Sequence, residues 1–434
     1  MKYFGTDGIR GKASELLNYD LAYKVGRSLG ILEKKRVVIS RDTRESGLML
    51  VKALKNGIID AGLEVLDIDI QSTPILAYMT ILNDCHGIMV TASHNPYQDN
   101  GIKVFNKGKK TLPQEEQVIE DVIDGKVTLD NLEGGIILPY ENPLLNYMKL
   151  YKDILTKYNG KITLDLANGA TINSAKHVFN TITQELDFIG DVPNGKNINE
   201  GVGSTHLDNL ANHVKTNGID IGFAFDGDGD RVLTIAADGT VIDGDLMIYI
   251  FASYLKEIGQ LDNDLVVLTK MSNLGIIEAL ANKGIKTIQA DIGDKWVIQA
   301  MEDNGAVIGG ENSGHIINKK LFISGDGVLN AAFLIKILNE KKITVLDLVK
   351  EVKFYPDRLF NLKNVDREIV KDPRIKSMVQ DFEAELGKSG KVLVRPSGTE
   401  PLIRISVSAK SKEQVDSIIQ TIADKILEIS KEKE

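Results

Sequence analysis

The sequence predicts an α/β protein that is built from several domains. Short apolar segments of strand length alternate with longer segments whose apolar residues recur at helical spacing, which is typical of helices layered on a mostly parallel sheet. The alternation restarts along the chain, and 434 residues are too many for one hydrophobic core. We therefore expect three α/β/α sandwich domains over residues 1–154, 155–245 and 246–352, and a smaller α+β domain over residues 353–434.

The first α/β segment shows the alternation most clearly. Leu21, Val25 and Leu29 recur at helical spacing. The other expected elements are, in chain order, a strand over 36–39, a helix over 44–61, a strand over 64–68, a helix over 74–82 and a strand over 86–90. We expect this domain to end in a polar helix that contains lysines, near residues 151–158.

The later segments repeat the pattern. Gly325-Asp326-Gly327 precedes an expected helix and predicts a turn with a helix cap. The other expected elements are, in chain order, a strand over 161–165, a helix that ends at 180, strands over 219–225, 307–308, 391–394 and 402–407, and a helix over 412–430.

Composition and charge exclude several classes of function. The hydrophobic share of 43% and the charged share of 26% are those of an ordinary globular protein. The net charge of -9 argues against nucleic acid or an anionic membrane as a partner. The most apolar window, residues 246–255, is about half the ~20 residues that a membrane span needs. A single cysteine, Cys85, excludes internal disulfides, and no signal-peptide pattern is present, so we expect a cytoplasmic protein with Cys85 in its core.

The segment Thr-Ala-Ser-His-Asn-Pro at 91–96 follows the expected strand over 86–90. Asn95-Pro96 enforces a turn, because proline lacks an amide hydrogen and restricts the residue before it. We expect Ser93 to be presented at this turn rather than packed, with His94 beside it and Lys103 nearby on the next strand. An ordinary loop serine is the alternative for this segment taken alone.

Residues 4–11 place Arg10 among three glycines. Glycines let a backbone curl so that amides point at an anion, and arginine offers a two-pronged donor to phosphate. A phosphate loop and a plain turn are both consistent with this pattern. A nucleotide-binding P-loop over 190–197 is excluded, because Asn197 stands where serine or threonine is needed and Pro193 lies inside the loop.

Residues 226–231, Asp-Gly-Asp-Gly-Asp-Arg, indicate a metal site. Carboxylates of Asp226, Asp228 and Asp230 repel one another unless a cation lies among them, and all-oxygen ligands favour Mg²⁺, Mn²⁺ or Ca²⁺. An EF-hand is excluded, because Arg231 and Ala237 stand where that loop needs glycine and glutamate. An exposed acidic turn is the alternative.

Two further loops carry polar groups between glycines. Residues 309–315 contain Glu311, Ser313 and His315, which suit hydrogen bonds to a polyhydroxyl ligand, or form an ordinary turn. The loop over 395–401 and the strand after it supply hydroxyls, glycine amides and two arginines, which suits a dianionic phosphate, with a solvated hairpin as the alternative. Its candidate ligands are Arg395, Ser397, Gly398, Thr399 and Arg404.

Taken together, the loops indicate phosphoryl transfer. Serine is a weak nucleophile by itself, but a phosphoserine held by a divalent cation is a phosphoryl donor whose charge is already neutralised. We therefore expect an enzyme that works through a phosphoserine intermediate.

The four loops TASHNP, DGDGDR, GENSGH and RPSGTEP occur in this order along the chain. In this respect the chain resembles the α-D-phosphohexomutase family over its whole length. The resemblance implies three related α/β/α domains and a smaller fourth in a heart-shaped arrangement around a central cleft, with a hinged last domain and often a homodimer. It implies interconversion of hexose 6-phosphates and 1-phosphates, with a hexose 1,6-bisphosphate as intermediate and activator.

The resemblance also implies roles for single residues. Ser93 would carry the phosphoryl group, and Mg²⁺ would be held by Asp226, Asp228, Asp230 and a phosphoserine oxygen. Charge on the transferring group would be stabilised by Arg10 and Arg231. Lys103 and His315, with His94 in support, are unranked candidates for proton transfer to and from the sugar hydroxyl. Glu311 and Ser313 would bind sugar hydroxyls. The phosphate that is not reacting would be bound by Arg395, Ser397, Gly398, Thr399 and Arg404.

Within the family, three stretches resemble the branch that acts on glucosamine phosphates, which feeds UDP-N-acetylglucosamine and cell-wall precursor synthesis. They are residues 4–11, residues 193–206 and residues 393–404. Asn312, Val202 and Trp296 depart from the residues usual in that branch, which are glutamine, cysteine and tyrosine. A phosphomannomutase/phosphoglucomutase with the same chemistry and a non-catalytic phosphosugar- or metal-binding protein are the alternatives.

Overall fold

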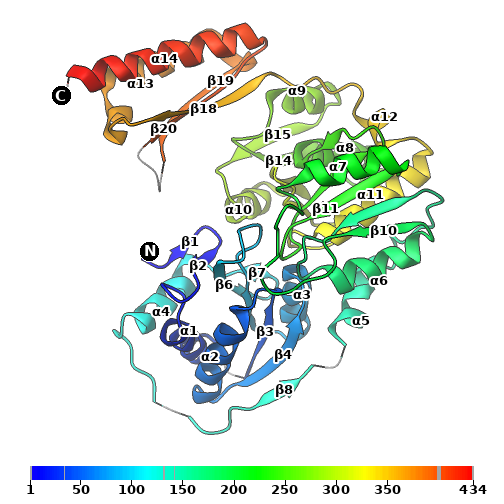
Figure 1. Ribbon diagram of the computed structural model, residues 1–434, viewed down its shortest axis with the longest axis vertical. Coiled ribbons are helices and arrows are strands. Elements are labelled where there is room, and N and C mark those ends of the chain that lie inside the picture. Colours follow the sequence, from blue (N-terminus) through cyan, green and yellow to red (C-terminus); the bar gives the residue numbers. More distant parts are fainter. Residues whose placement is uncertain (1, 34, 131, 141, 398–401, 433–434) are drawn as a thin grey trace. The chain divides into compact units, whose positions relative to one another are not determined.

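The computed structural model describes residues 2–33, 35–130, 132–140, 142–397 and 402–432. The chain divides into two compact units, which are Met1–Met271 with Ile285–Val349, and Ser272–Gly284 with Lys350–Glu434. The expected α/β class is confirmed, with mixed sheets and helices packed on them (Figure 1). The domain boundaries expected from the sequence stay predictions.

The first sheet has the strand order β1-β2-β6-β5-β3-β4-β8, and β7 pairs with β6. β5, β3, β4 and β8 run parallel, whereas β1, β2, β6 and β7 pair antiparallel. The strands are β1 Phe4–Gly5, β2 Gly8–Lys12, β3 Arg36–Arg41, β4 Glu64–Ile70, β5 His86–Val90, β6 Asp99–Asn106, β7 Lys109–Lys110 and β8 Ile137–Pro139.

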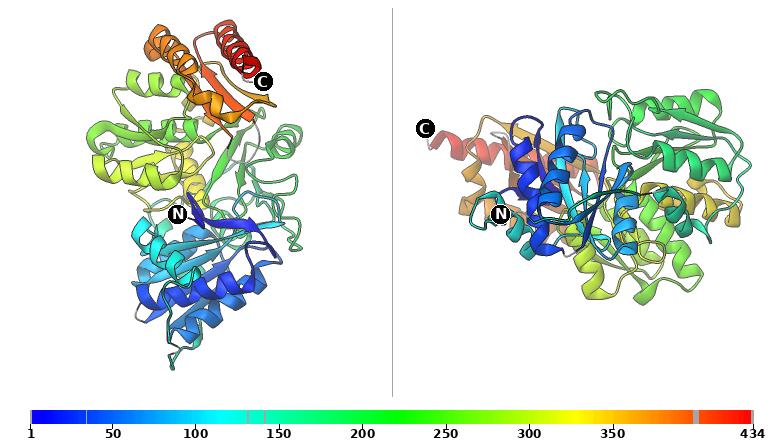
Figure 2. Two further views of the ribbon diagram at one scale, coloured as in Figure 1. Left: turned by 90° about the vertical axis from the view of Figure 1, so that its left-hand side faces the viewer. Right: turned by 90° about the horizontal axis from the view of Figure 1, so that it is seen from below.

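Helices cover both faces of this sheet (Figure 2). The side chains of Ile88 and Val90 in β5 belong to the core that α1 (Tyr19–Leu32) and α2 (Gly47–Asp60) complete, with α4 (Pro113–Ile123) beside α1. The opposite face carries α3 (Thr73–Leu82), which packs so closely that a Cβ on Gly87 would lie 2.5 Å from Thr80 Cγ2. Cys85 is buried as expected, and burial raises the pKa of its thiol to about 12.

The second and third sheets have the orders β10-β9-β11-β12-β13 and β15-β14-β16-β17. In each, the strand that leads into a candidate site loop, β11 or β16, lies between two neighbours and is buried along its length. The strands are β9 Ile162–Asp165, β10 Leu186–Ile189, β11 Ile221–Phe225, β12 Val232–Ala236, β13 Val241–Ile242, β14 Leu265–Thr269, β15 Lys286–Ala290, β16 Ile308–Gly310 and β17 Ile316–Asn318. The helices are α6 Ile172–Ile182, α7 Leu207–Asn217, α8 Gly244–Glu257, α10 Asp294–Asn304, α11 Gly327–Lys341 and α12 Val345–Val349, and a 3-10 helix spans Asp262–Asp264.

The prediction of a helix near residues 151–158 is wrong. A short α5 (Pro143–Tyr147) and a 3-10 helix (Met148–Tyr151) end there, and residues 155–159 form neither helix nor strand. Tertiary contacts take up the polar groups that a helix would pair internally. Asn339 of α11 donates to Thr156 Oγ1 at 2.8 Å and to the Lys157 carbonyl at 2.9 Å, and the Tyr158 amide donates to Ile182 O at 2.8 Å.

The second unit contains an antiparallel sheet with the order β18-β20-β19. Ile403, Ile405 and Val407 alternate along β20 and enter a core with apolar residues of α14, at the spacing that the sequence predicts. The elements of this unit are α9 Leu274–Asn282, β18 Asp357–Lys363, a 3-10 helix Arg367–Lys371, α13 Pro373–Leu386, a 3-10 helix Gly387–Ser389, β19 Lys391–Pro396, β20 Leu402–Ser408 and α14 Lys412–Glu432.

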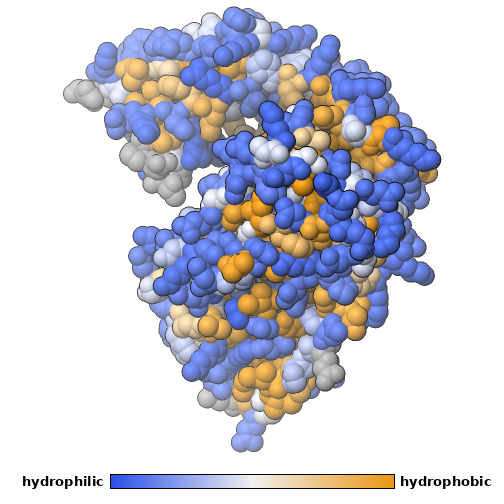
Figure 3. Space-filling view, turned by 45° about the vertical axis from the view of Figure 1, so that its right-hand side comes forward, coloured by the Kyte–Doolittle hydropathy of each residue, from blue (hydrophilic) through white to orange (hydrophobic). Residues whose placement is uncertain are grey.

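The surface is predominantly hydrophilic on the face drawn in Figure 3, with apolar residues interspersed. Among the residues that the structure describes, no helix combines the length and the apolar character that crossing a bilayer requires.

Candidate active site

Ser93 lies just beyond the end of β5 and faces the protein interior. Its Oγ donates a hydrogen bond to Asp226 Oδ2 at 2.5 Å, and His94 Nδ1 lies 3.3 Å from the same Oγ. The side chain is buried, so the expectation of a presented, unpacked serine is wrong. The reason is that the loop after β11, which is distant in sequence, covers this hydroxyl.

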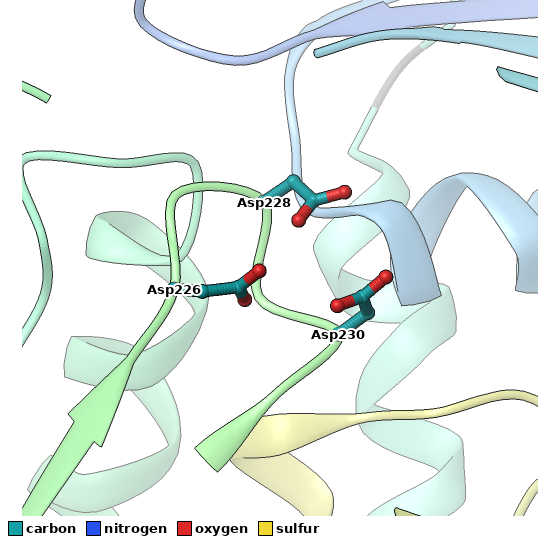
Figure 4. A group of neighbouring side chains, drawn as sticks. All are labelled: Asp226, Asp228 and Asp230. Atoms are coloured by element: carbon teal, nitrogen blue, oxygen red, sulfur yellow. The ribbon is translucent and has the colours of Figure 1, made fainter. Parts of the chain in front are cut away.

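The loop after β11 gathers three carboxylates. Asp226, Asp228 and Asp230 point toward one another (Figure 4), and one oxygen from each lies within 4.8 Å of the others. The intervening glycines allow this turn, because a Cβ on Gly227 would lie 2.5 Å from Ser93 O and a Cβ on Gly229 would lie 2.2 Å from the Thr171 side chain. A larger residue at Gly227 would therefore push the carboxylate loop away from the serine loop, and a larger residue at Gly229 would push it away from Thr171.

The buried carboxylates form a donor set that suits a hard divalent cation. In the described part of the chain, Oδ1 of Asp228 and Oδ1 of Asp230 are buried without a hydrogen-bond partner. With Ser93 Oγ they make an all-oxygen set of the kind that Mg²⁺, Mn²⁺ or Ca²⁺ prefers. The alternative of an exposed acidic turn is excluded, because all three aspartates are buried.

Charge is distributed unevenly over this cluster. Burial, and then the neighbouring carboxylates, raise the pKa of Asp226 well above its usual range. Burial also opposes ionisation of Asp230, but Lys103 and His315 outweigh it and hold the pKa of that carboxyl well below its usual range. A bound cation would remove much of the repulsion that raises the pKa of Asp226.

Lys103 reaches the same carboxylates from β6. Its Nζ lies 2.7 Å from Asp228 Oδ2 and 3.3 Å from both Asp230 Oδ2 and Asp7 Oδ2, in a fully buried position. Burial opposes the charge, yet the attraction of Asp228 and Asp230 raises the pKa of the ammonium group. Lys103 is therefore held in its charged form and donates hydrogen bonds to the carboxylates in this arrangement.

The two histidines of the site lie in different electrostatic surroundings. His315 is buried with Nδ1 3.6 Å from Asp230 and Nε2 3.8 Å from Asp294, and these carboxylates raise its pKa against the opposing effect of burial. Burial, and then the positive charges of Arg231 and Arg10, lower the pKa of His94 to about 4. At neutral pH, His94 can therefore accept a proton, and His315 is the better donor.

A cavity of about 160 Å³ in the first unit is lined by five of the expected site residues. Its walls include Arg10, Arg231, Glu311 and His315, which come from three separate stretches of the sequence. Glu311 accepts a hydrogen bond from the Gly293 amide at 3.0 Å, which fixes its carboxylate at the cavity wall. A polar pocket of this kind with both signs of charge suits a small phosphorylated ligand.

Ser313 differs from these residues. It is not among the residues that line the cavity, and within the described chain its Oγ is buried without a hydrogen-bond partner. Its expected contact with a sugar hydroxyl stays a prediction.

In the second unit, two arginines face each other across the sheet. Arg395 of β19 is the register partner of Arg404 of β20, and like charges directly opposite destabilise a sheet unless an anion lies between them. Ser397 follows β19 and is buried, and its carbonyl accepts a hydrogen bond from Arg367 at 2.9 Å. Gly398 and Thr399, the other expected phosphate ligands, lie outside the described residues.

Sequence models of phosphoglucomutase/phosphomannomutase domains match the chain in four consecutive stretches. The alpha/beta/alpha domains I, II and III match residues 1–129, 140–239 and 243–355, and the C-terminal domain matches residues 359–425. The chain belongs to the phosphoglucomutase/phosphomannomutase family. The expected enzyme class is thereby confirmed as well, because this family consists of phosphohexomutases, isomerases that relocate a phosphoryl group on a hexose.

Members of the family with curated names are similar over the full chain. A phosphoglucosamine mutase of Geobacillus kaustophilus is 43% identical over 445 residues, with 98% of each chain covered. A phosphoglucosamine mutase of Bacillus subtilis is 40% identical over 437 residues, again with 98% of each chain covered.

Solved structures of the family share the fold. A phosphoglucomutase/phosphomannomutase family protein of Burkholderia thailandensis superimposes with a TM-score of 0.81 at 24% identity, covering 98% of this chain and 97% of the other. An Aspergillus fumigatus N-acetylphosphoglucosamine mutase, solved with GlcNAc-6P and magnesium, gives a TM-score of 0.65 at 17% identity, covering 97% and 95%. At these identities the likeness shows the fold alone.

The cavity contains charged residues that the sequence motifs did not indicate. Lys110 of β7 lies 2.6 Å from Asp294 of α10 and also pairs with Asp7, and all three line the cavity. Burial lowers the pKa of Lys110 despite these carboxylates. The signals available were Asp7 inside the opening glycine motif and Asp294 in the Gly-Asp-Lys-Trp stretch, but neither indicated a partner. Trp296 of that stretch is 47% exposed.

Proposed function

We propose that the protein interconverts glucosamine 6-phosphate and glucosamine 1-phosphate through a phosphoserine at Ser93. The observation that carries the proposal is the hydroxyl of Ser93 held 2.5 Å from Asp226, inside a buried carboxylate cluster that suits a divalent cation. Full-length similarity to curated phosphoglucosamine mutases supports the amino sugar as substrate.

The proposed metal is one Mg²⁺ per chain. Asp226, Asp228 and Asp230 would hold it together with an oxygen of the phosphoserine. When bound, the ion supplies positive charge that offsets the negative charge of the transferring phosphoryl group.

The proposed reaction has two phosphoryl transfers. The sugar O1 hydroxyl attacks phosphorus of phosphoserine, and the O1–P bond forms as the Ser93 Oγ–P bond breaks. The O1 proton passes to a nearby base, and the released Ser93 Oγ takes up a proton from a nearby acid. The resulting glucosamine 1,6-bisphosphate turns over, and Ser93 Oγ gives up its proton and takes the phosphoryl group from O6, which gains a proton. Glucosamine 1-phosphate then leaves the phosphorylated enzyme.

The charged residues around the cavity have separate proposed tasks. Arg10 and Arg231 would stabilise the charge that develops on the phosphoryl oxygens. Among the candidates for proton transfer, His94 would accept a proton, because its lowered pKa keeps it neutral, and His315 would donate one, because its raised pKa favours the charged form. Lys103 holds its proton more tightly and would donate hydrogen bonds.

Sugar and non-reacting phosphate need other ligands. Glu311 and Ser313 would bind sugar hydroxyls. One serine must serve two phosphate positions, so the phosphate that is not reacting needs a fixed pocket. We propose that the second unit supplies it and moves as a lid, with Arg395, Ser397, Gly398, Thr399 and Arg404 as ligands.

Phosphorus NMR tests the proposal directly. The protein is given Mg²⁺, a trace of glucose 1,6-bisphosphate as activator, and the 6-phosphate of glucosamine, mannose or glucose. The expected result is fastest growth of the 1-phosphate from glucosamine 6-phosphate, and no growth with Ser93→Ala. Faster conversion of mannose or glucose would instead indicate the phosphomannomutase/phosphoglucomutase alternative, and no conversion of any sugar would indicate a binding protein.

A cytoplasmic location and a homodimer remain part of the proposal. The single buried cysteine supports a reducing compartment. Cell fractionation and light scattering of the purified protein test the two points.

A further inference from the structure

Ser93 has a backbone conformation that needs support. Its φ is +53°, in the left-handed region that residues with a side chain rarely adopt. Such a conformation persists where surrounding contacts hold it. At this position it determines where Oγ points, so whatever holds the backbone also aims the hydroxyl.

A closed ring of hydrogen bonds holds both backbone polar groups of Ser93. Its amide donates to Thr91 Oγ1 at 2.9 Å, and Thr91 Oγ1 donates to Asp42 Oδ2 at 2.7 Å. Arg44 Nε donates to the same Asp42 oxygen at 2.9 Å, and Arg44 Nη2 donates to the Ser93 carbonyl at 2.9 Å. All four residues are fully buried, so water does not compete for these bonds.

Arg44 is committed to this ring and its loop. Besides Ser93 and Asp42, its guanidinium donates to the carbonyls of Asn95 at 2.9 Å and Pro96 at 2.7 Å. Four of the five N–H donors of the guanidinium are therefore taken up by Asp42 and by carbonyls of the serine loop. Arg44 thus acts on the shape of this loop.

Asn199, in the loop between β10 and α7, holds the same serine loop. Its Nδ2 donates to Ser93 O at 2.9 Å and to Asn95 O at 3.0 Å, while its own amide donates to Ala167 O at 2.9 Å. Gly227 of the carboxylate loop approaches the same Ser93 carbonyl, since a Cβ there would lie 2.5 Å from it. Asn199 thus fixes the serine loop relative to the loop that carries the metal ligands.

We propose that Arg44 and Asn199 are positioning residues that aim Ser93 Oγ at the reacting phosphoryl group. Arg44 sets the left-handed backbone through the ring, and Asn199 sets the distance between the serine loop and the carboxylate loop. The inference rests on the proposed function, in which Ser93 carries the phosphoryl group.

Asn199→Gly is the sharpest test. Asn199 itself has φ +59°, which glycine adopts without strain, so this variant removes the amide and keeps the backbone. Asn199→Asp keeps the shape but directs an oxygen at the two carbonyls. The matched control is Asn197→Ala in the same loop, because within the described residues the hydrogen bonds of the Asn197 side chain go to Asn194 N and Val192 O and not to the serine loop.

The rate of phosphate transfer from glucose 1,6-bisphosphate to Ser93 is followed by mass spectrometry of the peptide that contains Ser93. We expect the Asn199 variants to slow this transfer and kcat by about 10- to 100-fold, with KM changed less than about twofold. The Asn197→Ala control should match the wild type. Asn199 variants as fast as the wild type, or a control equally slow, would overturn the proposal.

Arg44→Lys provides an independent test. Lysine keeps the charge but cannot reach Asp42 and three carbonyls together. Its control is Arg27→Lys, since Arg27 is also buried and grips the carbonyls of Asp60, Leu129 and Asp130 away from the site. If Arg44→Lys lowers the melting temperature but leaves the rate of phosphate transfer to Ser93 unchanged, the role of Arg44 is merely structural. A wild type that takes no phosphate at Ser93 would instead refute the proposed function.

Discussion

Asp326→Asn should remove a pH dependence from the stability of the first unit. Asp326 is buried at the start of α11, where its side chain accepts a hydrogen bond from the Leu329 amide at 3.0 Å, as the expected helix cap does. The Tyr147 hydroxyl donates to the same carboxyl at 2.7 Å, and the Tyr151 hydroxyl donates to Tyr147 at 2.7 Å. No cation of the described chain pairs with this carboxyl, and burial raises its pKa to about 7.

The magnitude follows from linkage between protonation and folding. A carboxyl with an unfolded pKa near 3.8 and a folded pKa of about 7 contributes a change of about 4 kcal/mol in the free energy of unfolding. Between these two pKa values the folded protein binds one proton more than the unfolded chain, so stability falls as pH rises. The slope is about 1.4 kcal/mol per pH unit from about pH 4 to about pH 7.

Urea unfolding of the wild type and of Asp326→Asn at several pH values measures this effect. Trp296 is the only tryptophan and lies in the first unit, so its fluorescence reports on the relevant part of the chain. Asparagine keeps the capping oxygen, and every other titrating group is common to both proteins. The free energy of unfolding of the wild type minus that of the variant should fall by about 4 kcal/mol toward alkaline pH. A difference that does not change with pH would refute the reasoning.

Three further predictions concern the site and its support. Gly227→Ala should lower mutase activity by at least about 100-fold, because the added Cβ would lie 2.5 Å from Ser93 O. Circular dichroism checks that the variant is folded, and a variant with wild-type activity would contradict the close approach of the two loops. His86 lies between Glu33 at 3.1 Å and Glu115 at 3.0 Å, and although burial opposes its charge, these carboxylates raise its pKa. The stabilisation by charged His86 should be complete below the ordinary pKa of histidine and should be lost as pH rises through the folded pKa. Calorimetry should therefore show that the melting temperatures of the wild type and of His86→Gln converge at alkaline pH. A difference in melting temperature that stays constant with pH would argue against a charged His86. Mg²⁺ added to chelator-treated protein should raise its melting temperature, because binding relieves repulsion among the three loop aspartates, whereas no shift at millimolar Mg²⁺ would argue against a metal site.

Much of the fold could be predicted because helices, strands and caps depend on residues that are close together in the sequence. The strands β5 and β11 are buried on both faces and appear in the sequence as short, mostly apolar runs, each followed directly by a polar residue. The cap at Asp326 is also local, since it joins residues three positions apart. The prediction of a helix near residues 151–158 is wrong, because the polar composition of this segment suits a helix while its hydrogen bonds go to distant elements such as α11.

The sequence by itself identified the loops that we propose to carry the chemistry: a serine after one strand, alternating aspartates after another, and arginines on neighbouring strands of the last sheet. Only the tertiary structure decided that Ser93 is buried against Asp226, that Arg44 and Asn199 grip its carbonyl, and that Lys110 joins the cavity through Asp294. The physical reason is distance along the chain. Asp226 follows Ser93 by 133 residues, and such contacts depend on how whole sheets pack, which no local spacing encodes.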